Sequence, residues 1–294
     1  MAAFVLRRLV LLVPQAAGAA LLAFGLVLLV PGDPVALALG PRASAERVAL
    51  LRAQLGLDEP WPQRFAGFLG RAFTGDLGTS IRGGVPVAQE IGLRLPATLA
   101  LAGAALVLAV GTGVPAGMLA AATPRAGRAV TVLAALGLAV PVYLLAPAAV
   151  GAVGLPTGAA GLLLPAVCVA AAPAAVLARV TRAAMHAATT EPHVRTARGK
   201  GLPPWRIAVV HVLPIALGAV VTLAGLLASA LLTGAVFVEV VFARPGLGRL
   251  TVDAVLARDL PVVQGVVLVV AACFLALNLL VDVVLRALDP RVAR

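Results

Sequence analysis

Long runs of apolar residues recur along the chain, and each has the length needed to cross a membrane as a helix. About 20 apolar residues without charges span a hydrocarbon core about 30 Å thick. The first five of six such runs contain no charged side chain, and the sixth contains only Asp282. Because helices satisfy their own backbone hydrogen bonds in lipid, the pattern predicts an all-α polytopic membrane protein with six transmembrane helices. The runs cover residues 9–30, 96–122, 129–150, 159–178, 212–233 and 261–285.

The polar segments between these runs divide the chain into three parts. Residues 1–30 hold the first helix, which exceeds the 7 to 15 apolar residues of a signal peptide, so we expect it to be retained. Residues 31–95 form one long structured loop, and residues 96–294 hold the other five helices. Pro96 is expected to open the second span.

Two short helices are predicted within the long loop. Ser44 precedes "AERVALLRAQLGL" as an N-cap, and this amphipathic helix is expected to end near Gly56. In "PWPQRFAGFLGRAFTG", the apolar positions Phe65, Phe68 and Phe73 recur near helical spacing, which favours a second helix on the membrane surface.

Composition excludes an ordinary soluble domain and orients the chain. Charged residues make up 12% of the sequence, against about 25% in soluble domains, and the mean hydropathy is +1.07. With the N-terminus in the cytoplasm, more than half of the 23 Lys and Arg residues face the cytoplasm, beside few acidic residues. We therefore expect both termini inside and the long loop outside. The net charge of +11 is explained by this orientation rather than by nucleic acid.

Motifs for catalysis and for cofactor binding are missing from the sequence. The three serines form no G-x-S-x-G, and the three histidines form no H-E-x-x-H. The only lysine, Lys200, is followed by Gly201 and lies in no phosphate-binding loop. We expect no catalytic residue, no metal and no cofactor on this chain, so that any ATP-driven function depends on an ATPase from another polypeptide.

A basic segment at residues 179–211 separates the fourth and fifth runs. Within "VRTARGKGLPPWRIAVV", Gly201 can adopt the positive φ that stops a helix, and Pro203 and Pro204 prevent its continuation. These residues predict a short cytoplasmic helix joined by a rigid bend to the next span, a shape suited to docking a soluble partner. A solvated basic loop that binds lipid headgroups fits the same residues.

The same segment resembles the EAA loop of ABC-transporter permeases, E-A-A-x₃-G-x₉-I-x-L-P. Arg195 replaces the family's Glu and His211 its Ile, whereas "VRTARGKGL" and "HVLPIAL" resemble the variant found in the dipeptide/oligopeptide/nickel import subfamily. The positions of the motif fall on Arg195, Thr196, Ala197, Gly201, His211, Leu213 and Pro214.

Further motifs extend this resemblance over nearly the whole chain. They are "LRRLVLLVPQ" with "VPGDPV", "LGLDEPWPQRFAGFLGRAFTGDLGTSIR", "RLPATLALA", "GAVFVEVVFARPGLGRLTVDAVLARDLPVVQG" and "NLLVDVVLRALDPRVAR". Their order and intervals resemble the first permease subunit of that subfamily, a dipeptide-permease-B-like protein.

The resemblance implies a non-catalytic subunit of an ATP-driven importer in a bacterial inner membrane. It would form half of a pathway for peptides delivered by an external binding protein. Its partners would be a homologous second permease subunit and two cytoplasmic ATPase subunits, or one fused ATPase, which carry ATP and Mg. The residues expected to couple to the ATPase are Arg195, Thr196, Ala197, Arg198, Lys200, Gly201, Leu202, Leu213 and Pro214.

A second set of residues is assigned to the pathway or its gate. Glu239 is costly in an apolar run, and a role in the pathway and a structural ion pair with Arg244 fit it equally well. For Asn278 and Asp282, spaced i,i+4, subunit packing or a helix-end hydrogen bond is favoured over substrate contact. The set comprises Glu239, Pro245, Gly246, Gly248, Asn278 and Asp282.

Other functions remain as alternatives. An importer of nickel or a metal chelate belongs to the same family, although the predicted pathway lacks His. A proton-coupled secondary transporter belongs to another class, and the absence of an internal repeat in the hydropathy pattern counts against it. An intramembrane enzyme would need a reactive Ser, Cys or metal cluster that the sequence lacks.

Overall fold

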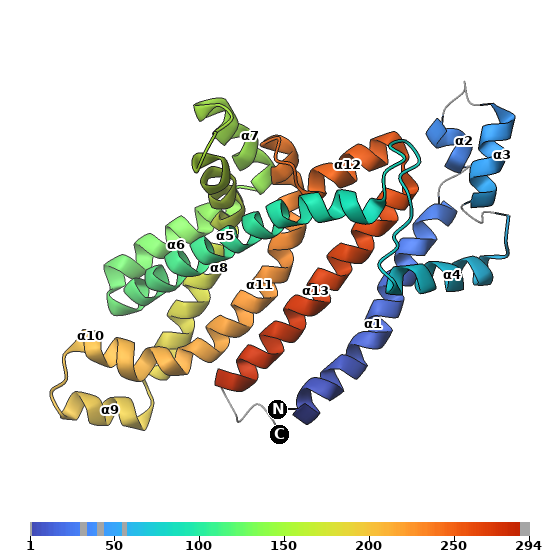
Figure 1. The fold of residues 1–294 in the computed structure, drawn as a ribbon. Helices are drawn as coiled ribbons and strands as arrows, with labels where there is room; N and C mark the ends of the chain where they lie inside the picture. Colours follow the sequence, from blue (N-terminus) through green and yellow to red (C-terminus); the bar gives the residue numbers. More distant parts are fainter. Residues whose placement is uncertain (1, 30–33, 40–43, 55–57, 289–294) are drawn as a thin grey trace. The chain divides into compact units, whose positions relative to one another are not determined.

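The computed structural model describes residues 2–29, 34–39, 44–54 and 58–288, and the regular elements among them are helical (Figure 1). Extended backbone pairs in this part of the chain at the bridge between Thr79 and Pro86. The helices are α1 (Ala2–Leu29), α2 (Pro34–Leu39), α3 (Ala45–Gln54), α4 (Trp61–Phe73), α5 (Val87–Ala122), α6 (Pro124–Ala139), α7 (Val142–Val153), α8 (Ala160–Ala188), α9 (Pro192–Gly199), α10 (Pro204–Arg206), the π-helix η1 (Ile207–Val212), α11 (Leu213–Val241), α12 (Leu247–Ala257) and α13 (Leu260–Leu288).

Five helical stretches are long and apolar enough to cross a membrane, which confirms five of the expected spans. The third expected span is a bent pair: α6 and α7 meet at 93°. The break falls at Val140 and Pro141, because a residue before proline is driven out of the helical region and Val140 is extended (φ −93°, ψ 107°). Counting the pair as one span gives six. The five stretches are Leu6–Leu26, Val87–Ala122, Ala160–Ala188, Pro204–Val241 and Leu260–Arg286.

The second span starts earlier than expected, since α5 begins at Val87 and Pro96 lies inside it. Val87 and Ile91 are buried in an apolar cluster with residues of α12 and α13, and this packing extends the helix toward the N-terminus. The prediction that Pro96 opens the helix was therefore wrong.

The predicted helices of the long loop are present. The backbone N–H of Arg47 donates to Ser44 Oγ (3.3 Å), which confirms Ser44 as the cap of α3. The expected end of this helix near Gly56 lies outside the described residues. In α4, Phe65 and Phe68 pack on Phe24 of α1, with ring centroids 5.3 and 5.8 Å apart.

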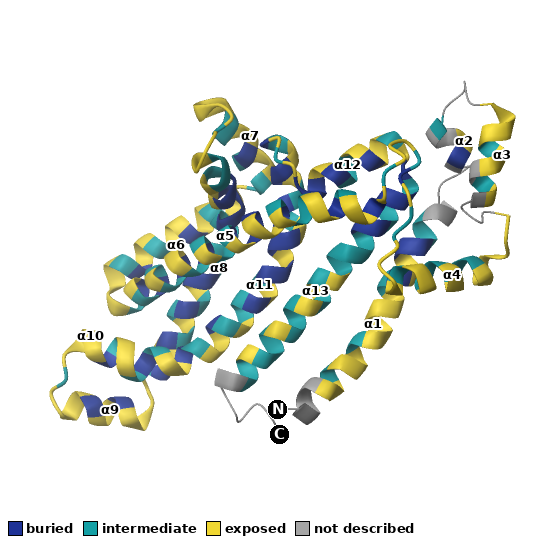
Figure 2. Ribbon diagram, viewed as in Figure 1, coloured by how far each residue is buried: buried dark blue, intermediate teal, exposed yellow. Residues whose placement is uncertain are grey.

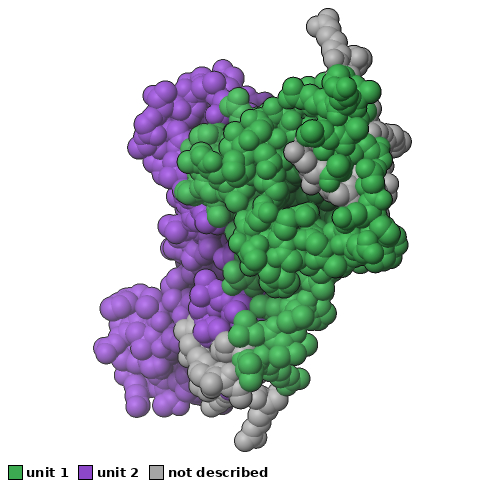
Figure 3. Space-filling view, turned by 45° about the vertical axis from the view of Figure 1, so that its right-hand side comes forward, with its two compact units in different colours: residues 1–98, 244–276 green, residues 99–243, 277–294 purple. Residues whose placement is uncertain are grey.

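The chain forms two compact units, residues 1–98 with 244–276 and residues 99–243 with 277–294 (Figure 3). In the second unit, buried residues concentrate along α8 and α11, whereas α1 in the first unit is largely exposed (Figure 2). Such an apolar exposed surface is expected of helices that face lipid.

Close contacts through small residues hold α5 against α8 in the second unit. Gly113 and Gly117, one turn apart, face this helix, and a Cβ at Gly113 would stand 2.6 Å from the carbonyl oxygen of Ala174. A Cβ at Gly117 would stand 2.5 Å from Cβ of Thr181. This spacing lets two helix backbones approach closely in a membrane, where packing rather than hydrophobicity drives association.

Candidate functional site

The candidate site is the segment that links α8 to α11, and it is built around the short helix α9. The backbone of this segment folds as the sequence predicts. Gly201 has φ +73°, the N–H of Leu202 donates to the carbonyl oxygen of Ala197 (3.4 Å), and that of Gly201 to the carbonyl oxygen of Arg198 (3.0 Å). This pair of bonds is the Schellman motif, which needs a left-handed residue and therefore favours glycine.

One face of α9 packs on the chain itself. Val194 and Ala197 are buried in a cluster with Met185 of α8 and with Ile207 and Val212 of η1. Ala197 was expected among the residues that couple to the ATPase, but only 4% of it is exposed. Its small side chain instead permits close approach of α9 to α8 and η1.

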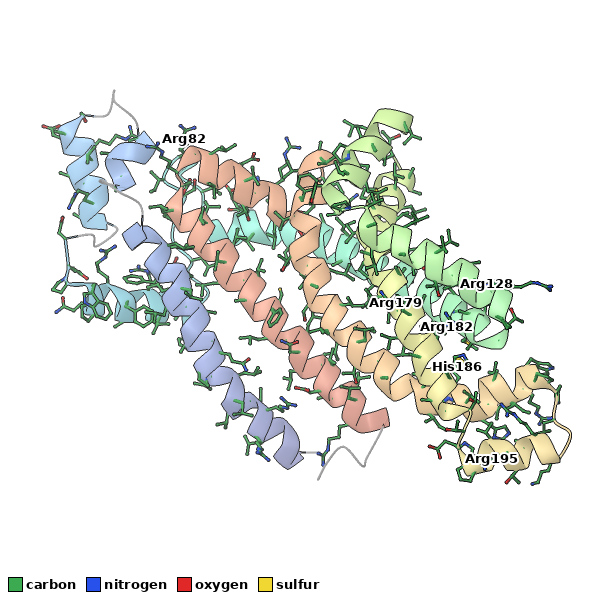
Figure 4. All side chains as sticks on the ribbon, turned by 180° about the vertical axis from the view of Figure 1, so that it is seen from behind. Arg82, Arg128, Arg179, Arg182, His186 and Arg195 are labelled. Carbon is green, nitrogen blue, oxygen red and sulfur yellow. The ribbon has the colours of Figure 1, made fainter. Side chains whose placement is uncertain are left out.

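The opposite face of α9 is exposed and basic. Arg195, Thr196 and Lys200 are exposed on this face. Arg198 is also exposed but lies toward the buried side of α9, where it lines a cavity together with Leu202, which is half-buried against the cluster below the helix. Figure 4 shows Arg195 on this short helix, beyond the end of α8. Between residues 99 and 238 the sequence contains Glu191 as its only acidic residue, so the exposed face carries a strong positive charge.

The bend between α9 and α11 is made by prolines and a π-helix. Pro203 caps the short α10, and the wide turns of η1 end where Leu213 and Pro214 begin α11. Pro214 has no N–H and its ring crowds the carbonyl of Val210, which the wider turn accommodates. Leu213 and Pro214 therefore lie at this bend and not on the exposed face of α9.

A further contact joins α9 to the bend and was not foreseen. His193 Nε2 lies 3.3 Å from the carbonyl oxygen of His211, and the tautomer protonated at Nε2 donates a hydrogen bond there. A second tie fixes α8, where Arg182 Nη1 donates to Thr131 Oγ1 (2.7 Å) and to the carbonyl oxygen of Gly127 (3.2 Å) in α6. Within the second unit, these contacts tie α9 to the bend and α8 to α6.

The residues assigned to the pathway or its gate are distributed over both units. Glu239, in α11 of the second unit, is fully buried. In the first unit Pro245 is exposed, whereas Gly246 and Gly248 are buried at the start of α12. There, the N–H of Leu247 donates to Thr98 Oγ1 (2.8 Å).

Asn278 and Asp282 lie half-buried along α13. Ser229 Oγ of α11 donates to Asn278 Oδ1 (3.3 Å), so Asn278 takes part in packing two helices of the same chain. This contact joins helices of one chain, and the expected role of Asn278 in packing between subunits stays a prediction.

A buried polar site in the first unit escaped the sequence analysis. The carboxylate of Asp259 accepts hydrogen bonds from Ser80 Oγ (2.5 Å) and from the N–H groups of Ile81 (3.2 Å) and Arg82 (3.2 Å). It pins the hairpin before α5 to the start of α13. Ser80 and Asp259 are 179 positions apart, so no local signal identifies the pair.

Metal ligands do not gather among the described residues, where no three His, Cys, Asp or Glu side chains come together.

Comparisons with known proteins bear on this helical architecture. Residues 113–294 match the family "binding-protein-dependent transport system inner membrane component", and residues 1–102 match its N-terminal companion family. The chain belongs to this family. The match to the main family covers α8, the basic helix α9 and the bend into α11, so this inner membrane component carries the candidate site within its family region.

Relatives of this inner membrane component match it over almost its whole length. It is 36% identical to the dipeptide transport system permease protein DppB of Escherichia coli, over 98% of each chain. It is 39% identical to a putative peptide transport system permease protein of Brucella abortus, over 99% of each chain.

The fold also resembles a solved transporter. An inward-facing structure of the MetNI methionine ABC transporter matches with a TM-score of 0.58 at 19% identity, over 68% of this chain and 96% of that chain. The family matches and the two relatives show that the chain is a dipeptide-permease-B-like ABC permease, a multi-pass inner membrane protein and a transport subunit.

Proposed function

We propose that this permease forms half of the translocation pathway of an ATP-driven peptide importer, with a second, homologous permease subunit as the other half. An external binding protein delivers the peptides, and two ATPase subunits or one fused ATPase bind and hydrolyse ATP with Mg. The peptide as substrate is supported by the relatives of Escherichia coli and Brucella abortus, which are named as peptide or dipeptide permeases.

The observation that carries the coupling role is the geometry of α9. Its apolar face is fixed to α8 and η1, and its basic face is exposed. A force on the exposed face passes into the start of α11 through a bend that prolines and a Schellman motif make rigid. The exposed face, with Arg195, Thr196 and Lys200, is the proposed ATPase contact. The buried Ala197 and the bend residues Gly201, Leu202, Leu213 and Pro214 set its position.

The basic face of α9 supports both the chemistry proposed for the partner and the proposed topology. Cationic side chains of α9 meet an acidic groove on the ATPase, and both termini of the chain lie in the cytoplasm. The long loop before α5 then faces outward, toward the binding protein.

The test of coupling uses two glycines of the same segment. Gly201 has φ +73° and Gly199 is helical, yet a Cβ at either position meets nothing within 4 Å. Gly201→Val places a β-branched residue in the left-handed region at a cost of at least about 1–2 kcal/mol, whereas Gly199→Val avoids this strain. We expect Gly201→Val to abolish peptide-stimulated ATP hydrolysis in the reconstituted complex, with membrane insertion intact, and Gly199→Val to retain most of it.

Normal stimulation in Gly201→Val would contradict a coupling role for the bend. The same reconstituted complex, assayed with a panel of peptides and metal chelates, tests the substrate class. Stimulation by peptides is expected, and stimulation by a nickel chelate alone would replace the peptide by the alternative substrate. Transport that needs no ATPase and collapses with the proton gradient would instead support a secondary transporter.

A further inference from the structure

A cavity of about 300 Å³ lies beneath α9, and we call it the coupling-helix cavity. Its walls are mainly apolar: Met118 and Ala121 come from the last turns of α5, Met185 from the last turn of α8, and Ala208 and Val212 from η1. Its volume is at the lower end of the range of small-molecule sites, about 300 to 1,000 Å³. The coupling role proposed for α9 does not use this cavity.

The polar edge of the cavity has one positive charge. Arg198 and Thr189 line it together with the apolar residues. The hydroxyl of Thr189 already donates to the carbonyl oxygen of His186 (2.7 Å), so the charge preference comes from Arg198. Within the described part of the chain, no acidic side chain forms an ion pair with Arg198. An apolar cavity with one guanidinium at its edge is complementary to a molecule with an aliphatic tail and an anionic head.

The helices that line the cavity include candidate membrane spans, and the ends of spans are expected at a membrane surface. The cavity lies where the candidate spans α5 and α8 end and where the span formed by α10, η1 and α11 begins. Trp205, next to the lining residue Pro204, is 68% exposed, and Val209 and Val210 are also exposed. An exposed Trp beside exposed valines is typical of the membrane–water interface, where the indole ring sits among lipid headgroups.

Two further arginines of the second unit lie on α8, the helix whose last turn lines the cavity. Arg179 and Arg182 follow one another along α8, and Figure 4 shows them on the way to α9. Basic pockets between transmembrane helices on the cytoplasmic side attract anionic lipid headgroups.

We propose that the coupling-helix cavity binds an anionic phospholipid of the cytoplasmic leaflet. Part of one acyl chain lies between Met118, Met185 and Ala208, and the phosphate pairs with Arg198. A soluble protein is the less suitable occupant, because the face of α9 that carries Arg195 and Thr196 lies opposite the buried face and offers the more accessible contact. The lipid supports α9 from below and makes coupling depend on the anionic lipid content of the membrane.

The experiment measures lipid retained by the complete transporter, purified and reconstituted in nanodiscs of phosphatidylglycerol and phosphatidylcholine. Native mass spectrometry of the released complex counts bound lipids. We expect the wild type to retain phosphatidylglycerol in preference to phosphatidylcholine. Ala208→Phe fills the cavity and should lose the retained lipid. Ala219→Phe, at an exposed position of α11 outside the cavity, is the matched control and should keep it.

Two further variants keep the proposal testable if Ala208→Phe does not fold. Ala208→Leu adds less volume and should reduce retention at an unchanged melting temperature. Arg198→Gln should lower the preference for phosphatidylglycerol about fivefold while neutral lipid still binds, which is the effect of one basic residue near an anionic surface.

Three results overturn the proposal. The first is equal retention of both lipids by the wild type, and the second is full retention by both Ala208 variants. The third is the finding that, in a complex without lipid, a side chain of the ATPase fills the cavity. Lipid retention requires no substrate, so these outcomes are separate from the test of peptide import.

Discussion

The carboxylate of Asp259 joins two distant segments of the first unit through three hydrogen bonds. It is 3% exposed and accepts from Ser80 Oγ and from two backbone N–H groups of the hairpin before α5. The N–H of Gly83 in turn donates to Ser80 Oγ (2.8 Å). A buried donor that loses its acceptor destabilises the folded protein by its full desolvation penalty. The contact between the hairpin and α13 therefore depends on the side chain of Asp259.

We expect Asp259→Ala to lower the stability of the protein by about 1–3 kcal/mol, because Ser80 and the two N–H groups lose their acceptor. Asp253→Ala is the control, since Asp253 is exposed on α12 and its ion pair with Arg249 is long at 3.8 Å. Such a surface pair contributes about 0–1 kcal/mol. Thermal unfolding in detergent compares the two, and equal melting temperatures would rule out a structural role for the network.

The role of a residue could be predicted from the sequence where that role depends on neighbouring residues. Ser44 caps α3 and Gly201 ends the segment of α9, because capping and positive φ depend on the nearest residues. Asp259 and the buried side of Ala197 were not readable, because their partners lie far away in sequence. The same holds for His193, whose contact with His211 depends on the fold of the bend.

Among the helices, the pairing of α5 with α8 depends on the absence of side chains at two positions. Gly113 and Gly117 both face α8, and any Cβ would collide with backbone as well as with side chains. These helices lead to α9 and to the coupling-helix cavity, so their packing sets the frame of the candidate site.

We expect Gly117→Val to destabilise the protein by about 1–3 kcal/mol, since it forces atoms into a contact that is already filled. Gly111→Val, on an exposed side of the same helix where a Cβ meets nothing within 4 Å, should have a much smaller effect. Thermal unfolding and the yield of folded protein in detergent distinguish them, and similar losses in both variants would argue against close α5–α8 packing.

Helix boundaries departed from the sequence prediction for identifiable reasons. The sequence analysis placed residues 87–95 in the long loop because polar residues lie among them. In the structure these residues form the first turns of α5, because Val87 packs in a cluster with α12 and α13. Pro141 lies within the third apolar run of the sequence, but a proline alone does not predict the 93° angle between α6 and α7. A proline breaks the backbone pattern locally, and the packing around it determines the direction that follows.

For the whole molecule, the apolar runs and the distribution of basic residues lead to one orientation. A helix of 36 residues such as α5 is about 54 Å long, more than the hydrocarbon core requires. As a candidate span it is expected to have its two ends on opposite faces of the membrane, with the hairpin at Arg82 before it and the link to α6 after it.

We expect a membrane-impermeant maleimide to label Arg82→Cys in intact cells and to label Thr190→Cys only after permeabilisation. Both positions are exposed, and the native Cys168 and Cys273 lie within α8 and α13 and are replaced by Ala in the test protein. The label is read by a mass shift. The reverse pattern would invert the topology and place α9 outside, where no ATPase could reach it.

The sequence by itself determined that this chain crosses the membrane repeatedly as helices, that its basic loop ends a short helix at Gly201, and that it carries no ATPase motif. Each conclusion follows from composition, periodicity or the conformational limits of glycine and proline, which act over a few residues. The tertiary structure decided which face of α9 is buried, that α6 and α7 form a sharp bend, and that a cavity remains below α9. These features depend on side chains from distant helices filling, or failing to fill, the same space, and pairwise packing of that kind has no local signature.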